Sequence, residues 1–143
     1  MVFDNILVVC VGNICRSPMA AAMLAKRYPQ KHIDSAGVSA LVDYPADAKA
    51  IEVMATDDTD IESHIAKQIS EDLVRQADLI LTMSTSQTKW LEDQWPHCRG
   101  KTFRIGHWIG KDIEDPYGLP TSVFEVAKSN IIDSLEQWNE KII

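Results

Sequence analysis

The segment Ile6-Leu7-Val8-Val9-Cys10-Val11, followed by Gly12-Asn13 and then by Ser17-Pro18, decides the fold. Six consecutive apolar residues, most of them β-branched, indicate a strand that is buried on both faces, as in a parallel sheet. Gly12-Asn13 ends this strand. Ser17-Pro18 opens an alanine-rich segment that reaches Tyr28, with Ser17 as a good N-cap and Pro18 favoured at the first helical position. The chain therefore begins with a strand, a tight loop and a helix.

Further apolar runs alternate with helical patterns along the rest of the chain. We expect strands at 32–38, 79–81 and 102–105, and helices at 47–54, 70–75, 84–95 and 122–141, the last opened by a capping box of Ser122 and Glu125. This alternation predicts a single α/β domain over residues 1–143 with a mainly parallel sheet. Ligands bind such sheets at the carboxyl ends of the strands, so the loop after the first strand is the leading candidate site.

Composition excludes several classes of protein. The net charge is -7 and no Lys/Arg cluster is visible, so nucleic acid is not expected as a partner. No apolar run is long enough to span a membrane, and the acidic start of the chain does not fit a signal peptide. Three cysteines and four scattered histidines, without a Cys-x-x-Cys pair, argue against a disulfide framework or a zinc site. We therefore expect a cytoplasmic protein with reduced thiols and no metal.

The loop from Cys10 to Ser17 has the features of an anion-binding cradle. A loop between a strand and a helix can aim several backbone N–H groups at one point, and the helix N-terminus adds partial positive charge. We expect Gly12 and Asn13 to adopt the left-handed conformations that such a tight loop requires. Arg16 adds a planar guanidinium that binds phosphate oxygens in a bidentate way. These residues together suit a tetrahedral dianion.

Cys10 lies at the mouth of this cradle, five residues before Arg16. Positive surroundings favour the thiolate form of a cysteine, and a thiolate here is placed to attack phosphorus and form a phosphocysteine intermediate. The Cys-x5-Arg spacing alone is weak evidence, because a buried strand cysteine followed by a surface arginine would look the same. The full string from Cys10 to Pro18, between a strand and a helix, is far more specific.

The string Cys10-Val11-Gly12-Asn13-Ile14-Cys15-Arg16-Ser17-Pro18 resembles the signature of the low-molecular-weight protein tyrosine phosphatases, and the similarity extends over nearly the whole chain. The resemblance implies a four-stranded parallel sheet flanked by helices, and a reaction through phosphocysteine without metal or cofactor. It also implies that phosphate is bound by the residues after the nucleophile, namely Val11, Gly12, Asn13, Ile14, Cys15, Arg16 and Ser17.

Asp115-Pro116-Tyr117 resembles the second motif of that family. The resemblance implies that Asp115 is the general acid for the leaving phenolate and then the general base for water, although Asp-Pro by itself is also an ordinary loop turn. It implies that Tyr117, Ile14 and Leu41 line the slot for the substrate ring. Gly118 and Leu41 depart from the aromatic residues that some relatives carry, which affects substrate preference rather than phosphate chemistry.

Several polar residues are similar to those that support the loop in the family. The resemblance implies that Asn13 is held by Ser17, Ser35 and His64, and that Ser17 also stabilises the thiolate. The plainer alternatives are an N-cap for Ser17 and a solvent-facing or capping histidine for His64. Cys15 is either a redox guard that forms a reversible disulfide with the nucleophile or a small apolar filler.

The stretch Gly106-His107-Trp108 resembles the bacterial branch of the family, which is paired with tyrosine kinases of polysaccharide export. It implies an autophosphorylating tyrosine kinase, or its substrates, as partner. Three alternatives remain. Phosphoarginine phosphatases carry Thr where Ile14 stands, arsenate reduction needs a downstream cysteine pair where only Cys98 is present, and a non-catalytic phosphate-binding module could dispense with Cys10 or Asp115.

Overall fold

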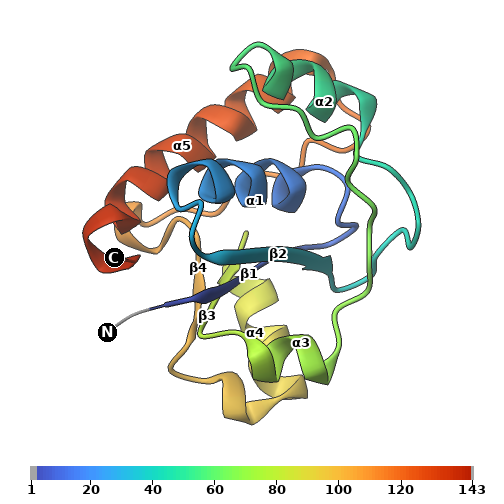
Figure 1. The fold of residues 1–143 in the computed structure, drawn as a ribbon. Coiled ribbons are helices and arrows are strands. Elements are labelled where there is room, and N and C mark those ends of the chain that lie inside the picture. The colour runs from blue at the N-terminus through green and yellow to red at the C-terminus, as the bar shows by residue number, and fades with distance from the viewer. Residues whose placement is uncertain (1–2, 143) are drawn as a thin grey trace.

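Four strands form one parallel sheet in the computed structural model, which describes residues 3–142 (Figure 1). The sheet has the order β2-β1-β3-β4, with β1 at Asn5–Cys10, β2 at His32–Gly37, β3 at Leu79–Thr82 and β4 at Thr102–Arg104. β1 pairs with β2 from Asn5↔His32 to Cys10↔Gly37 and, on its other edge, with β3. The predicted α/β class and parallel sheet are confirmed.

Five helices cover the two faces of this sheet. They are α1 (Arg16–Arg27), α2 (Ala48–Ala55), α3 (Glu71–Gln76), α4 (Thr85–Gln94) and α5 (Thr121–Ile142). Figure 1 shows α1, α2 and α5 on one face and α3 and α4 on the other. The pleat of β1 divides its apolar run accordingly, because Ile6, Val8 and Cys10 join the core of the first face while Leu7 and Val9 join the second.

The strand order places the loop after β1 at a switch point. β1 lies between β2 and β3. The first crossover leads from β1 to β2 on one side of it, and the second leads from β2 back past β1 to β3 on the other side. In such sheets a crevice opens outside the carboxyl ends of the strands at this point. No helix within residues 3–142 is both long and apolar enough to cross a membrane.

Two predicted helix starts are wrong. α1 begins at Arg16 with Cys15 in the N-cap position and no side-chain cap, so Ser17 lies inside the helix and its hydroxyl contacts Cys10 instead. α5 begins at Thr121, before Ser122, so the predicted capping box is not the start of that helix. Its second member, Glu125, forms an ion pair with Lys128 one turn later. At α1 a contact with β1 thus replaces the expected local cap, and at α5 the expected cap partner pairs within the helix itself.

The buried face of α5 differs from the predicted stripe at its first position. Ala127, Ile131, Leu135 and Trp138 are buried as the helical spacing indicates. The first turn is instead anchored by Phe124, which is fully buried, while the predicted Val123 is half-buried. The buried stripe by which α5 packs against α1 and α2 therefore starts at Phe124 and not at Val123.

Candidate active site

A pocket of about 220 Å³ opens at the carboxyl end of β1. Its lining brings together most residues predicted for the site: Cys10, Val11, Gly12, Ile14, Cys15, Arg16, Leu41, Asp115 and Tyr117. Asn13 and Ser17 are fully buried and do not line it. Ser39 lines the pocket but was missed by the sequence analysis. Its position just after a strand, at the same sheet edge as Cys10, is the signal that could have found it.

The backbone carbonyl groups of the loop from Cys10 to Ser17 are directed toward neighbouring segments of the chain. The carbonyls of residues 10, 11, 12 and 14 accept hydrogen bonds from N–H groups of residues 38, 39, 41 and 47. The carbonyl of Asn13 contacts the His64 ring, and that of Cys15 accepts from Met19. Within residues 3–142 no protein acceptor is found for the N–H groups of residues 11, 12 and 14–17. Six unpaired donors thus surround the start of α1, where the helix dipole adds partial positive charge.

Asn13 supplies the sharp turn that this arrangement requires. Its φ of 60° lies in the left-handed region, which Asn tolerates better than most residues. The same expectation for Gly12 is wrong, because its φ is not positive. A side chain at Gly12 would meet only Ile14 and Leu41 at ordinary contact distances. One left-handed residue is therefore enough to close the loop.

The sulfur of Cys10 is buried among polar groups at the base of the pocket. The side chain is 2% exposed, and its Sγ lies 2.9 Å from the Ser17 hydroxyl. The backbone N–H of Asn13 also donates to this sulfur, at 3.3 Å. The Ser17 hydroxyl already accepts from the side-chain amide of Asn13, so its own hydrogen is available to the sulfur.

Asn13 lies at the centre of the buried hydrogen bonds behind the loop. Its side-chain amide donates to the hydroxyls of Ser17 (2.7 Å) and Ser35 (3.0 Å), and its side-chain oxygen accepts from the backbone N–H of Lys67 (2.9 Å). The structure thus brings together the four residues expected to support the loop. The contact with Lys67 was not predicted, because a backbone donor leaves no trace in side-chain chemistry.

His64 contacts the same residue through its backbone. Its Nε2 lies 2.6 Å from the carbonyl oxygen of Asn13. Burial lowers the pKa of His64, and the hydrogen bond to Asn13 opposes that effect only in part. A neutral ring that donates from Nε2 fits both observations.

Arg16 is a buried cation with unused hydrogen-bonding capacity. Its side chain is 5% exposed, and NH1 donates to the carbonyl oxygen of Ile113 at 2.9 Å. NH2 lies 3.6 Å from the carboxylate of Asp115. Its Nε is buried and has no partner, alone among the buried side-chain nitrogens and oxygens of residues 3–142. A buried guanidinium of this kind needs an anion to complete its hydrogen bonds.

Asp115 and Tyr117 enter the pocket from the segment before α5. Asp115 is half-exposed, and its Oδ1 accepts a hydrogen bond from the backbone N–H of Tyr117 at 3.1 Å. Tyr117 is 58% exposed and faces the pocket rim together with Leu41. The carboxylate is therefore close to Arg16 yet accessible to solvent, as a group that exchanges protons requires.

The other cysteines differ from Cys10 in their surroundings. Burial, reinforced by Asp47 and Cys10, raises the pKa of Cys15 far above its ordinary value, so its thiol stays protonated at neutral pH. Cys98 is fully buried in the core on the α3 and α4 face of the sheet. All three cysteines are free thiols. Residues 3–142 contain no cluster of three His, Cys, Asp or Glu side chains that could hold a metal ion.

Comparisons with known proteins agree closely with this geometry. The family model for low molecular weight phosphotyrosine protein phosphatase matches residues 5–143. The protein-tyrosine-phosphatase Ptp of Acinetobacter johnsonii is 49% identical over 142 residues, which cover 99% of this chain and 100% of that protein. Wzb of Vibrio vulnificus, solved with benzylphosphonate, is 44% identical with a TM-score of 0.93, covering 97% of this chain and 99% of that chain.

The fold itself is shared by proteins of different specificity. The arginine phosphatase YwlE of Geobacillus stearothermophilus has a TM-score of 0.90 and 31% identity, and the match covers 96% of this chain and 92% of that one. Proteins of this fold therefore include an arginine phosphatase as well as protein-tyrosine phosphatases.

Proposed function

We propose a mechanism for this chain, which belongs to the low molecular weight phosphotyrosine protein phosphatase family and is a protein-tyrosine phosphatase. The reaction passes through a phosphocysteine intermediate on Cys10, and Asp115 acts as general acid and then as general base. The whole of residues 1–143 acts as one phosphatase domain in this proposal. The substrate is a phosphotyrosine side chain of another protein.

In the first step the thiolate of Cys10 attacks phosphorus and the bond from phosphorus to the phenolic oxygen breaks. Asp115, in its protonated form, gives its proton to the leaving oxygen, so that neutral tyrosine departs. The six unpaired N–H groups of the loop and the guanidinium of Arg16 bind the phosphoryl oxygens as charge builds on them. Ser17 and the N–H of Asn13 stabilise the thiolate before attack.

In the second step water hydrolyses the phosphocysteine. The carboxylate of Asp115 takes a proton from water, oxygen attacks phosphorus, and the bond from phosphorus to sulfur breaks. Inorganic phosphate leaves and Cys10 returns as the thiolate. Cys15 does not compete as nucleophile, because burial raises the pKa of its thiol and keeps it protonated.

The observation that carries this proposal is the buried Arg16 beside Cys10. Its partnerless Nε, the unpaired N–H groups of the loop and the start of α1 all require a compact anion at the same place. A cationic substrate would be repelled by Arg16, and a neutral one would offer weaker acceptors than phosphate to this set of donors. Ile14, Leu41 and Tyr117 give the mouth of the pocket an apolar wall that suits the ring of phosphotyrosine.

The nucleophile is tested with Cys10→Ser against Cys98→Ser as a matched control on the other face of the sheet. We expect Cys10→Ser to lose all measurable release of phosphate from phosphotyrosine peptides, while inorganic phosphate still raises its Tm. Cys98→Ser should retain turnover. Equal turnover in wild type and Cys10→Ser would remove Cys10 from the mechanism.

Substrate class is tested with matched phosphotyrosine, phosphoserine and phosphoarginine peptides in reducing buffer. We expect turnover on phosphotyrosine, because the apolar side chain of Ile14 lines the slot. Faster release from phosphoarginine would assign the activity of the structural neighbour YwlE to this chain. No turnover on any peptide from folded protein would leave a phosphate-binding module.

The proposed partner is an autophosphorylating bacterial tyrosine kinase that serves polysaccharide export, and the proposed compartment is the cytoplasm, where Cys10 stays reduced. The similarity to the protein-tyrosine-phosphatase Ptp of Acinetobacter johnsonii and the exposed Tyr117 at the pocket support a protein substrate. The test is the loss of phosphate from such an autophosphorylated kinase, compared at equal concentration with a phosphotyrosine peptide of unrelated sequence. A slower reaction on the kinase than on the peptide would speak against this partner.

A further inference from the structure

The segment that carries Asp115 has no regular structure after the turn at His107–Ile109. It is nevertheless attached to the sheet at successive points. Gly106 packs directly beneath the carbonyl of Lys111, so that a Cβ there would overlap this oxygen. The carbonyl of Gly106 also accepts hydrogen bonds from the N–H groups of Ile109 and Lys111. Residues 106–111 thus form a closed loop, and the chain leaves it at Asp112.

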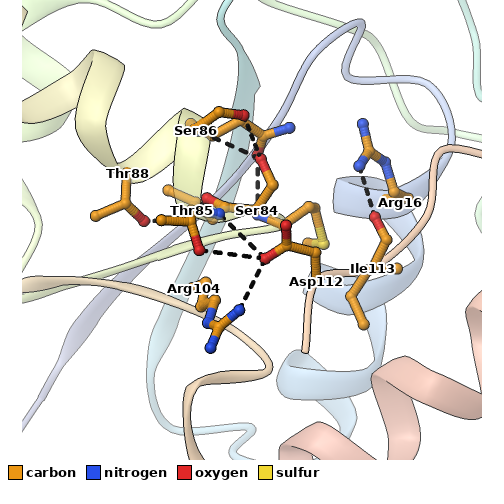
Figure 2. Close-up of polar contacts among 11 residues, drawn as sticks. Arg16, Ser84, Thr85, Ser86, Thr88, Arg104, Asp112 and Ile113 are labelled. Carbon is orange, nitrogen blue, oxygen red and sulfur yellow. Dashed lines mark hydrogen bonds and ion pairs between the residues drawn. The ribbon is translucent and has the colours of Figure 1, made fainter. Parts of the chain in front are cut away.

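Asp112 joins this exit point to two other elements, as Figure 2 shows. Its Oδ1 accepts hydrogen bonds from the guanidinium of Arg104, at the end of β4, at 3.0 Å and from the backbone N–H of Thr85 at 3.1 Å. The Thr85 hydroxyl lies 3.4 Å from the same oxygen. Thr85 is the first residue of α4, so the carboxylate satisfies one of the free N–H groups at the start of that helix.

The next residue, Ile113, continues the attachment through its backbone. Its side chain is 1% exposed, its N–H donates to the carbonyl of Met83, and its carbonyl accepts from Arg16. Asp115 follows two residues later, and its one hydrogen bond within residues 3–142 is with Tyr117 of its own loop. Its carboxylate also lies 3.6 Å from the guanidinium of Arg16. The place of the Asp115 carboxylate therefore depends on where the chain is held on its two sides, at 112 and 113 before it and at Leu119, whose carbonyl accepts from Lys49, after it.

We propose that Asp112 is a positioning residue for the general acid: by binding Arg104 and the first N–H of α4, it holds the loop so that Asp115 reaches the leaving oxygen. This inference rests on the role proposed above for Asp115. Asp112 is exposed and its contacts point away from the pocket residues, so it takes no part in binding phosphate. An exposed ion pair contributes little to global stability, so removing it should disturb the loop more than the fold.

The experiment compares kcat/KM for two esters that differ in their need for a general acid. Phenyl phosphate has a poor leaving group and needs the proton from Asp115, whereas p-nitrophenyl phosphate has a better leaving group and needs it less. We expect Asp112→Ala to lower kcat/KM for phenyl phosphate roughly 10- to 100-fold, as a displaced catalytic group does, and for p-nitrophenyl phosphate by less than about 3-fold. Inhibition by inorganic phosphate should stay unchanged.

Glu114→Ala is the matched control, since Glu114 is an exposed carboxylate of the same loop with no polar contact among residues 3–142. It should leave both esters unaffected. The double variant Asp112→Ala with Asp115→Asn should be no slower than Asp115→Asn alone, because Asp112 acts through Asp115. Thermal unfolding verifies that each variant is folded. If Asp112→Ala does not fold, Asp112→Asn is used in its place with the same two esters.

Failure of the inference is distinguishable from failure of the proposed function. If Asp115→Asn slows phenyl phosphate selectively but Asp112→Ala behaves as wild type, only the inference is overturned. It is also overturned if Asp112→Ala slows both esters equally or weakens inhibition by phosphate, because Asp112 would then act through Arg16. Wild-type rates for Asp115→Asn on both esters would remove the general acid and this inference together.

Discussion

Replacing Asn13 should remove the hydrogen bonds that join the loop from Cys10 to Ser17 to β2 and to the segment at Lys67. The side chain makes three buried hydrogen bonds, to Ser17, Ser35 and the N–H of Lys67, and the residue is 0% exposed. At about 1 kcal/mol net for each bond, Asn13→Ala loses about 3 kcal/mol. Alanine at a φ of 60° adds about 1 kcal/mol of backbone strain, so the expected loss is about 4 kcal/mol.

The assay is urea unfolding in reducing buffer, followed by tryptophan fluorescence. Asn13→Gly removes the same hydrogen bonds without backbone strain and should lose about 3 kcal/mol. Asn139→Ala is the matched control, because Asn139 is exposed and its side chain accepts hydrogen bonds from Arg27 and Tyr28. It should cost less than about 1 kcal/mol. A loss below about 1 kcal/mol for Asn13→Ala would refute the central role given to these hydrogen bonds.

Two further predictions concern residues that touch the loop from outside. Gly37→Ala should destabilise the protein by about 2 kcal/mol and weaken inhibition by phosphate, because its Cβ would overlap the carbonyl oxygen of Val11; Gly12→Ala, where the nearest atom lies at 3.7 Å, is the control for stability. Burial is the main cause that lowers the pKa of His64 in the folded state. Below about pH 6.5 the unfolded chain therefore binds more protons at this residue than the folded chain does. The stability of the fold with a neutral His64 is fully present above that pH and is lost as the pH falls below it. Urea unfolding at pH 5 to 7 should therefore show a smaller pH dependence for His64→Gln than for wild type. Equal slopes in wild type and His64→Gln would contradict the burial of a neutral ring.

The order of strands and helices could be predicted from the sequence because it depends on local periodicity. The run from Ile6 to Cys10 is buried on both faces, and the structure divides it between two cores as the pleat requires. The prediction is wrong for Val11, the last residue of the predicted run, which is 39% exposed and follows the end of β1. The spacing from Cys10 to Arg16 is likewise a property of one short segment, so the loop and its chemistry could be inferred before any contact was known. Boundaries were less accurate: Ser17 and Ser122 were expected to cap helices, but α1 begins at Arg16, with the Ser17 hydroxyl against Cys10, and α5 begins at Thr121.

Contacts between distant segments were available only from a resemblance, or were missed. Ser35 and His64 lie 22 and 51 residues from Asn13, and nothing in the local pattern indicates that their side chains meet it. The backbone N–H of Lys67 and the pairing of Asp112 with Arg104 and Thr85 were not predicted at all. Hydrophobic periodicity reports which face of an element is buried, but it does not report which loop lies beside which.

The amino-acid sequence by itself therefore determined a parallel α/β sheet, and it predicted a nucleophile and an anion cradle after the first strand. The tertiary structure decided which residues surround that cradle. The order β2-β1-β3-β4 places the carboxyl ends of β1 and β3 side by side, and the loop that follows β4 then brings Asp115 to within 3.6 Å of Arg16. The physical reason is that strand pairing is a long-range choice, made by the packing of the whole core rather than by any one segment.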